Sequence, residues 1–531
     1  MAKRTEWLIL ASILVIGALF RFYNLNWDQG HYFHPDERNI AVAVGKIRFF
    51  SQMNPDFFAY GSVPVYLYRS AADIVVKITG DVDWTRDWGK INLIGRHFSA
   101  LFSTITVLLV YLLTRKILIP TAALVAAWVT ATTPILIQQA HFSVTESMLA
   151  FWVVLLTYLT VQRKNPIILG CMFGLSVATK MSALSFGIIP IAMFIWKKQT
   201  KRIFIFLLTA SLIYGILSPY TFLRWDKFME SMNYEGGIIT GKLLVVYVYQ
   251  FLQTQPYLYQ LSQLPYTQGY VLAGLSIAGC ILLIINTTKH KKWPIVMVFL
   301  WPLLYFLYVG SWFTKFVRYF VPLYPFLSIA AAYFIANLNK NIKWVFLAVL
   351  VISPFLRSIA FMHIYASPQT RIAASDWIYE NVAKKSTILT EHWDDGLPLS
   401  FSPQKDPGIY QTRQLTIYEP DNLEKIDYYA ENLSQADFLF INSRRLYGTL
   451  MHLSNRYPIT SKYYKLLFNG SLGYKKVAEF TVYPTLKLGS WVFEFNDDNS
   501  EESFQVYDHP KVFIFENVAH LSKEQLKTQF L

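Results

Sequence analysis

Two adjacent carboxylates, Asp36 and Glu37, follow the first apolar run of the chain, in the stretch GHYFHPDERNIAVAV (residues 30–44). Charged side chains are costly beside a lipid bilayer and usually mark a functional site when they lie there. Two neighbouring carboxylates can divide acid–base chemistry, one acting as the base and the other as an orienting acceptor. A capping role is the alternative, because Pro35 suits a first helical turn and acids there complement the helix dipole.

The same stretch contains His31 and His34, which together with the two acids could hold a metal ion. Their spacing matches no closed zinc site, and zinc favours softer ligands. An oxygen-rich magnesium or manganese site that also uses Glu146 is a second alternative. The sequence therefore favours no cofactor, with a divalent metal kept as the alternative.

Glu146 is a third acid at the start of an apolar run, in the stretch QQAHFSVTESMLAFW. Ser143 or Thr145 could cap a helix here, and Glu146 would then only complement its dipole. We weigh this capping role equally against a role in the site.

Basic residues near the ends of other apolar runs are the natural complement of these acids. Several of them at one cavity would bind a phosphate group, and arginine would do so in bidentate fashion. The alternative is that each side chain simply reaches the lipid headgroups. The candidates are Arg38, Arg96, Lys180, Lys315 and Arg318.

The elements that must position these residues belong to a membrane protein. Of the 531 residues, 54% are hydrophobic and 17% aromatic, which exceeds the apolar content of typical soluble domains. A membrane span needs about 17–25 mostly apolar residues. The sequence predicts about eleven such helices, at 7–23, 93–113, 120–137, 147–161, 167–179, 182–196, 203–219, 269–286, 293–312, 319–337 and 344–361.

The net charge of +14 is located in the short polar breaks between these runs. The positive-inside rule places such breaks in the cytoplasm. The N-terminus would then be cytoplasmic and uncleaved, and the C-terminus would lie outside a cell or inner membrane. A nucleic-acid partner would instead require a basic stripe on a folded domain, and the sequence has none. The basic breaks lie at residues 3–6, 115–116, 163–164, 197–202, 289–292 and 340–343.

Three segments are expected outside the membrane. A first outer loop, 24–92, contains two amphipathic stretches, 38–50 and 63–78, that read as interfacial helices. A second outer loop covers 220–268. The tail, 362–531, alternates strand-like and helix-like stretches, which predicts an α/β domain with a partly parallel sheet. The strand candidates are 386–392, 413–419, 437–443, 475–483 and 511–517, and the helix candidates are 370–382, 422–433 and 444–457.

Taken together, the stretches FHPDERNIAVAV, HFSVTESMLAFW, GLSVATKMSAL and KFVRYFVPLYPFLSIAA resemble the C-type glycosyltransferases of the protein-mannosyltransferase superfamily (glycosyltransferase family 39). The lipid A aminoarabinose transferases are similar in layout. The resemblance covers residues 1–361, a transmembrane glycosyltransferase module, and residues 362–531 look like the appended outer domain of bacterial members. It implies a hexosyltransferase-type enzyme that uses a polyprenyl-phosphate sugar and acts on a protein, lipid or glycan acceptor.

The resemblance also implies roles for individual residues. Asp36 matches the family's catalytic base, Glu37 the second acid of the pair, and Glu146 the acid of the second outer loop. Arg38 matches a phosphate-contacting arginine with an offset of one residue. The family's Lys-Pro-Pro segment has no counterpart in YGSVPVYLY, so Lys180, Lys315 and Arg318 become the other candidates for binding the donor phosphate.

Other classes of function fit less well. A transporter or flippase of lipid-linked sugars would show related halves and broken helices at the midplane, and we find no internal repeat. A scaffold that binds a partner through its tail leaves the acids unexplained. A metal-dependent oligosaccharyltransferase would be stopped by a chelator.

Overall fold

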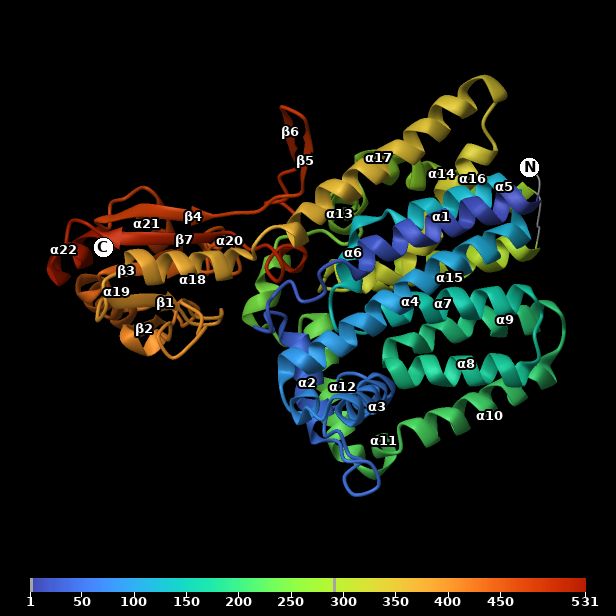
Figure 1. Cartoon of the computed structure of the whole chain (residues 1–531), viewed down its shortest axis with the longest axis horizontal. Coiled ribbons are helices and arrows are strands. Elements are labelled where there is room, and N and C mark those ends of the chain that lie inside the picture. The colour runs from blue at the N-terminus through green and yellow to red at the C-terminus, as the bar shows by residue number, and fades with distance from the viewer. Residues whose placement is uncertain (1–2, 290–292) are drawn as a thin grey trace. The chain divides into compact units, whose positions relative to one another are not determined.

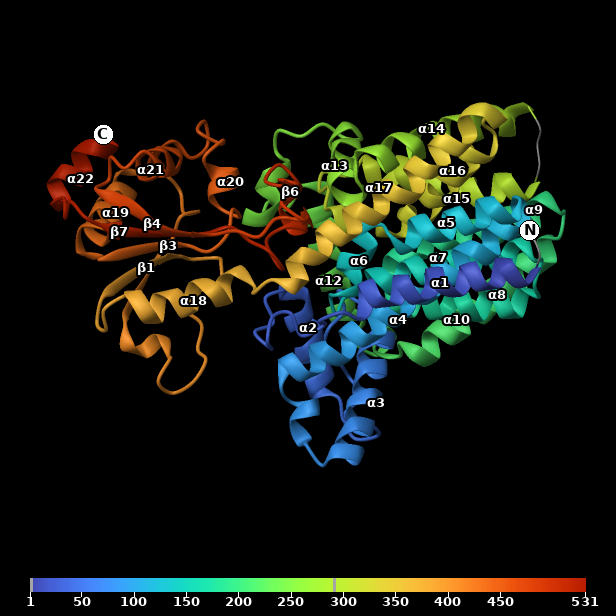
Figure 2. The ribbon, with the colours of Figure 1, turned by 45° about the horizontal axis from the view of Figure 1, so that its top comes forward.

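The computed structural model describes residues 3–289 and 293–531, and the chain divides into two compact units. Unit 1 contains residues 1–243 and 255–362, and unit 2 contains residues 244–254 and 363–531. Figures 1 and 2 show unit 1 as a bundle of helices and unit 2 as a sheet with helices around it. Each unit is described separately below.

Unit 1 is entirely helical apart from turns in the described residues. Its elements are α1 (Lys3–Phe22), α2 (Pro35–Lys46), α3 (Ser62–Thr79), η1 (Val82–Thr85), α4 (Trp88–Ile117), α5 (Pro120–Ala131), α6 (Pro134–Ala140), α7 (Glu146–Val161), α8 (Pro166–Thr179), η2 (Met181–Gly187), α9 (Ile188–Trp196), α10 (Thr200–Leu217), α11 (Tyr220–Leu223), α12 (Trp225–Thr240), α13 (Leu258–Gln268), α14 (Tyr270–Lys289), α15 (Trp293–Gly310), η4 (Val317–Leu323), α16 (Tyr324–Ala336) and α17 (Lys340–Ala366).

Every predicted apolar run contains helix in the described residues. Five helical segments are long and apolar enough to cross a membrane, and a sixth arises if α5 and α6, bent by 55°, form one span. The other runs correspond to shorter apolar helices of 10–17 residues. The number of helices that cross the bilayer, expected to be eleven, therefore stays a prediction.

Close helix packing in unit 1 depends on small residues at the crossings. Figures 1 and 2 show α8 beside α10, and a Cβ on Gly170 or Gly174 of α8 would meet the α10 backbone within 3 Å. A Cβ on Gly279 of α14 would lie 2.0 Å from the carbonyl oxygen of Ala330 in α16. Small residues are enriched where membrane helices approach closely, which agrees with a membrane bundle.

The first outer loop is folded as expected. The two amphipathic stretches form α2 and α3, and α2 packs against both α3 and α4. Pro35 occupies the first turn of α2, where its missing N–H costs nothing. This turn fixes the position of the acid pair.

Unit 2 is an α/β domain, as predicted. Its elements are η3 (Val246–Phe251), α18 (Thr370–Asn381), β1 (Thr387–Glu391), η5 (Pro407–Ile409), β2 (Gln411–Leu415), α19 (Leu423–Gln435), β3 (Phe438–Ile441), α20 (Tyr447–Leu450), α21 (Pro458–Phe468), β4 (Tyr474–Phe480), β5 (Thr485–Leu488), β6 (Trp491–Glu494), η6 (Glu502–Phe504), β7 (Val512–Asn517) and α22 (Lys523–Phe530).

The main sheet of unit 2 is partly parallel, with strand order β2-β1-β3-β7-β4. β1 pairs in parallel with β2 (Thr387 opposite Gln411) and with β3 (Leu389 opposite Leu439), whereas β7 runs antiparallel to both β3 and β4. Alternate side chains of each strand face opposite sides. Accordingly, Ile388 packs with α18 on one face and Leu389 packs with α19 and α21 on the other.

The tail differs from its prediction in several places. Only Tyr447–Leu450 (α20) of the predicted helix 444–457 is helical, and the helices α21 and α22 were not predicted. The β5–β6 hairpin was not predicted. In addition, residues 244–254 of the second outer loop belong to unit 2, where Tyr249 packs on Tyr457 with ring centroids 5.9 Å apart.

Candidate active site

Asp36 lies at the start of α2, and its carboxylate forms an ion pair with Arg318 of η4, 282 positions later in the chain. Both side chains are about one-fifth exposed, so the pair is accessible to small molecules. The N-cap of α2 is His34, whose Nδ1 accepts a hydrogen bond from the Asp36 N–H at 3.2 Å. The Asp36 side chain is therefore not needed as the helix cap.

Glu37, the second acid, is fully buried behind the first. Its two oxygens accept hydrogen bonds from Nε and Nη2 of Arg96 at 2.9 and 2.6 Å. The same guanidinium bonds both oxygens of buried Asp28, at 2.8 and 2.6 Å. Nη1 of Arg96 also donates to the carbonyl of Leu25 at 2.9 Å, and the Trp27 ring lies 4.8 Å from the guanidinium carbon.

One cation is thus shared by two buried carboxylates, which titrate differently. Burial opposes the ionisation of Asp28, but the charge and hydrogen bonds of Arg96, together with the N–H donors of Gly30 and Tyr32, hold the pKa of Asp28 below its usual value. Burial raises the pKa of Glu37 above its usual value despite Arg96. The network joins α2, α4 and the turn after α1, and so it fixes the helix that carries Asp36.

A close backbone approach completes this network. Ser143 donates its N–H to Oε1 of Glu37. A Cβ on Gly95 of α4 would lie 1.8 Å from Oγ of Ser143, so a side chain at this position would push the 141–145 segment away. Gly95 therefore has to remain small for the donor to reach Glu37.

Glu146 and Lys180 form a second pair in unit 1. Glu146 begins α7 and is buried, and its Oε1 accepts from Nζ of Lys180 at 2.8 Å. Its Oε2 is buried with no hydrogen-bond partner among the described residues. The Lys180 ammonium also lies 4.7 Å from the centroid of the Tyr60 ring. Thr145 makes no side-chain cap here, so the capping interpretation of this segment is not supported.

Glu235 of α12 belongs to the same surroundings. Burial raises its pKa above the usual value, and the charge of Lys180 acts in the opposite sense. Helix α7, which carries Glu146, packs against η4, which carries Arg318. The two ion pairs therefore lie on adjacent elements.

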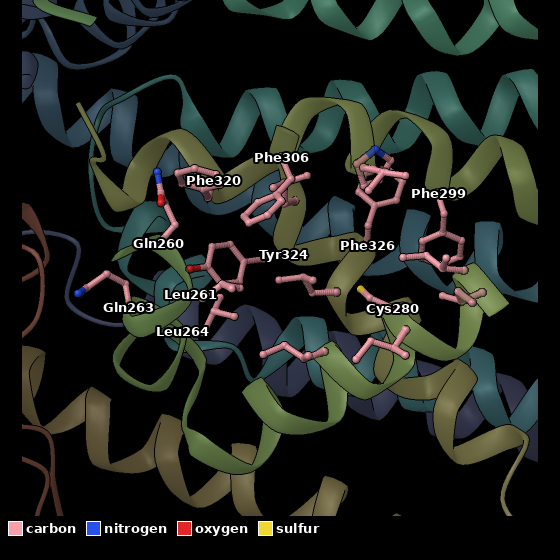
Figure 3. A pocket seen from close by; sticks show the side chains of 18 of the residues that line it. Gln260, Leu261, Gln263, Leu264, Cys280, Phe299, Phe306, Phe320, Tyr324 and Phe326 are labelled. Atoms are coloured by element: carbon pink, nitrogen blue, oxygen red, sulfur yellow. The ribbon is translucent and has the colours of Figure 1, made fainter. Parts of the chain in front are cut away.

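A long apolar cavity of about 450 Å³ opens among α13, α14, α15, η4 and α16. Figure 3 shows Gln260 and Gln263 at one end and Cys280 and Phe299 at the other. Lys315 also lines the cavity, and burial lowers its pKa below the usual value. Lys315 is three residues from Arg318, so the polar lining and the accessible ion pair share one segment.

The structure thus brings together some predicted residues and separates others. Asp36 forms an ion pair with Arg318, and Glu146 forms one with Lys180. Glu37 instead pairs with the buried Arg96. Arg38 follows on α2 and is half-buried. The described residues contain no group of three or more His, Cys, Asp or Glu side chains placed to hold a metal ion.

Two acids of these networks were not recognised from the sequence. Asp28 lies in a turn with no helical or strand periodicity, and its hydrogen bonds from the N–H groups of Gly30 and Tyr32 became evident only in the structure. Glu235 lies in the second outer loop, at the end of the stretch SPYTFLRWDKFMESMNYE, and was not singled out there. An acid two residues before an outer-loop glycine was the available signal for Asp28.

Comparison with protein families gives one match. The model for dolichyl-phosphate-mannose-protein mannosyltransferases matches residues 85–223, a range that contains Arg96, Glu146 and Lys180 but neither Asp36 nor Arg318. No curated protein sequence matches the chain.

Solved structures of an archaeal oligosaccharyltransferase share the fold at low sequence identity. The Archaeoglobus fulgidus oligosaccharyltransferase tethered to an acceptor peptide gives a TM-score of 0.54 at 14% identity over 97% of this chain and 89% of that one. The same organism's AglB with an inhibitory peptide and a dolichol-phosphate gives 0.54 at 14% identity over 87% and 72%. ArnT from Cupriavidus metallidurans bound to undecaprenyl phosphate gives 0.47 at 12% identity over 98% and 99%. Residues 85–223 therefore resemble the dolichyl-phosphate-mannose-protein mannosyltransferases, and the chain shares the fold of the archaeal oligosaccharyltransferase.

Proposed function

We propose that the protein is a membrane glycosyltransferase that moves a sugar from a polyprenyl-phosphate-linked donor to an acceptor hydroxyl, with inversion at the anomeric carbon. Asp36 is the general base. The observation that carries this proposal is the accessible Asp36–Arg318 pair, whose cationic segment continues to Lys315 in the wall of an apolar cavity. A base beside cations and an apolar slot is what a lipid-phosphate sugar donor requires.

The cavity supplies the binding site for the lipid. Its lining is almost entirely aliphatic and aromatic, which suits an isoprenoid chain, and a few polar groups at one end suit a phosphate head. Lys315 lines the cavity, and Arg318 follows it by three residues in the sequence. Arginine binds phosphate with paired hydrogen bonds, and lysine adds a compact charge.

Transfer then needs one proton acceptor and a stabilised leaving group. Asp36 takes the proton of the acceptor hydroxyl while the hydroxyl oxygen bonds to the anomeric carbon. The bond from that carbon to the phosphate oxygen breaks, and the polyprenyl phosphate leaves with the electron pair. General-base assistance contributes about 10²–10⁴ in rate. Cations preorganised around the leaving phosphate contribute a few kcal/mol each.

The Asp36–Arg318 pair also suggests how the base is made ready. Arg318 bonds the Asp36 carboxylate in the structure. A donor phosphate competes for the guanidinium, and its arrival frees the carboxylate to face the acceptor. The buried Glu37 acts as a positioning residue through Arg96, and Glu146 positions Lys180 in the same way. Arg38 remains a further candidate for the phosphate.

The reaction would take place on the outer face of the cell membrane, with the N-terminus in the cytoplasm. The charge of the polar breaks supports this orientation. A transporter or flippase of lipid-linked sugars is the alternative function, and it would use the same lipid cavity without chemistry. No divalent metal is proposed.

The test uses the full chain in lipid nanodiscs with polyprenyl-phosphate sugars labelled in the sugar and a mixture of envelope acceptors. We expect time-dependent transfer that a chelator does not reduce, and NMR of the product should show an anomeric configuration opposite to that of the donor. Retention of configuration would refute direct displacement. Movement of intact donor between leaflets, with no transfer from any donor, would favour the flippase. Loss of transfer with chelator would favour a metal-dependent oligosaccharyltransferase.

A further inference from the structure

Unit 2 carries a group of aromatic and polar side chains that the proposed reaction does not use. β1 lies between β2 and β3, and all three strands are parallel. The chain leaves β1 for β2 on one side and later returns to β3 on the other. In open α/β sheets, ligands bind outside the carboxyl ends of the strands at such a switch point. A ligand of this sheet would contact the segments that follow β1, β2 and β3.

Three rings line this edge. His392 and Trp393 follow β1, and Tyr418 follows β2. The centroid of the Tyr418 ring lies 5.5 Å from the ring centroids of both His392 and Trp393. The Tyr418 hydroxyl is 2.5 Å from Nδ1 of His392. Trp393 is 39% exposed, so a ligand in solution can reach its indole ring.

The backbone at Trp393 supports a function for this side chain. Its φ of 95° lies in a region that a bulky residue rarely adopts. Such conformations persist where the surrounding structure imposes them, and they gather at binding sites. Here the strained residue holds an indole ring at the surface rather than in the core.

Polar groups suited to hydroxyls adjoin the rings. Asp394 accepts hydrogen bonds from Arg371 at 3.1 Å and from Ser443, which follows β3. Asn442 donates its side-chain N–H to the Asp395 carbonyl. The amide oxygen of Asn442, which is 3% exposed, has no hydrogen-bond partner among the described residues. A buried acceptor without a donor is costly, and a ligand hydroxyl would satisfy it.

We propose that this edge of unit 2 is a saccharide-binding site. A pyranose presents one face of C–H groups, which packs on an aromatic ring through dispersion and weak C–H contacts, and a rim of hydroxyls, which bond to carboxylate and amide groups. The rings of Trp393 and Tyr418 supply the stacking surface for the C–H face. Asp395 and Asn442 supply the polar groups for the hydroxyls.

A nucleotide or other phosphate ligand fits this edge less well. Phosphate sites at switch points use the N–H groups at the start of a helix that directly follows a strand. Here β1 is followed by an irregular segment, 392–410, in which η5 is the first helical turn. Asp395 would also repel an anion, and Asp394 already occupies the Arg371 guanidinium.

The site gives a substrate class to the reaction proposed above, and this extension rests on that proposal. If the protein transfers a sugar, the saccharide bound by unit 2 is the acceptor, and the acceptor is therefore a glycan or glycolipid. Binding itself requires neither Asp36 nor a donor. The two proposals can therefore fail separately.

The test measures glycoside binding to the full chain in lipid nanodiscs free of sugar-based detergent. The probes are the methyl glycosides of glucose, mannose, galactose and N-acetylglucosamine. Their binding is measured by saturation-transfer difference NMR in the absence of a sugar donor. We expect at least one glycoside to bind. Trp393→Ala should weaken that binding by about tenfold or more, as the loss of a stacking ring does elsewhere. The matched control is Trp491→Ala on β6, which removes another exposed indole of unit 2 and should change nothing.

Each outcome decides the matter. Binding of no glycoside, or binding that Trp393→Ala leaves unchanged, would overturn the site. Binding of serine- or threonine-containing peptides but not of glycosides would overturn it in favour of a peptide site. Tyr418→Ala serves as the second variant if Trp393→Ala does not fold. Asp36→Asn should retain glycoside binding even if it abolishes transfer, which separates this site from the proposed reaction.

Discussion

Replacing Arg96 by methionine tests the network that positions Asp36. The change removes four hydrogen bonds of 2.6–2.9 Å to Asp28 and Glu37 and leaves both carboxylates buried without their cation. Methionine fills a similar volume, so the cavity contribution is small. Removing one partner of a buried ion pair costs about 3–5 kcal/mol. That is a large fraction of the 5–15 kcal/mol typical of folded domains.

The matched control lies on the same helix. Arg115, at the other end of α4, is 44% exposed and bonds Glu6 at 2.9 Å. Arg115→Met removes the same side chain from a pair whose arginine is exposed, and Tyr111 still donates to Glu6, so the cost is about 0–1 kcal/mol. Arg96→Lys keeps the charge but cannot bond both carboxylates with a planar fork, so it should fall between the two methionine variants.

The dependence on pH gives a second signature. In the wild type, the lowered pKa of Asp28 means that its contribution to stability is present above its ordinary value of 3.8 and is lost as pH falls through the folded pKa. Without Arg96, burial raises the pKa values of both carboxylates, opposed by the N–H donors of Gly30 and Tyr32 at Asp28 and of Ser143 at Glu37. The stability of the variant is then lost as pH rises. The deficit of Arg96→Met should therefore be largest near pH 8 and smallest near pH 5.

The assay is denaturant-induced unfolding of the protein in nanodiscs, followed at both pH values for the four proteins. We expect the order Arg96→Met, Arg96→Lys, Arg115→Met and wild type, from least to most stable. Adding Glu37→Gln to Arg96→Met should recover part of the loss, because one stranded charge disappears. An Arg96→Met deficit no larger than that of Arg115→Met, or one that does not change with pH, would refute the reasoning.

Three further predictions concern the donor cation, the cavity and unit 2. Arg318→Ala should lower kcat by about 10²–10³ with little change in thermal stability, and an unchanged kcat would remove Arg318 from the donor site. Cys280→Trp places a large ring in the cavity. It should raise KM for a long polyprenyl donor more than KM for a two-isoprene donor. Equal effects on the two KM values would contradict lipid binding in the cavity. Burial raises the pKa of Glu391 to about 8 from 4.5, so its contribution to stability is lost as pH rises through that range. Glu391→Gln should therefore slow amide exchange in β1 at pH 9 but not at pH 5, and a change independent of pH would refute this explanation.

Much of the helical architecture could be predicted because it depends on local composition. Apolar runs bounded by charges become helices wherever backbone groups must be satisfied away from water, and α2 and α3 follow from their amphipathic pattern. The strands β1, β3 and β7 also matched their apolar stretches. The β5–β6 hairpin did not, because its exposed residues have no core against which a pattern would be selected.

The site was predictable as a set of residue types but not as a set of partners. The acids and bases near the outer ends of helices were recognisable, yet no local rule joins Asp36 to Arg318 across 282 positions or assigns Arg96 to Glu37 and Asp28. Such pairs depend on how helices pack. For the same reason, the attachment of residues 244–254 to unit 2 was not visible in the sequence.

The central claim, that Asp36 is the base of a sugar transfer, is tested most directly by one rate comparison. Wild type, Asp36→Asn and the control Asp83→Asn, which alters an exposed acid of the same outer loop, are assayed for transfer from a labelled polyprenyl-phosphate sugar. We predict that Asp36→Asn loses about 10²-fold or more in rate while its unfolding midpoint stays at that of wild type, and that Asp83→Asn keeps full activity. Equal transfer by Asp36→Asn and wild type would contradict the account.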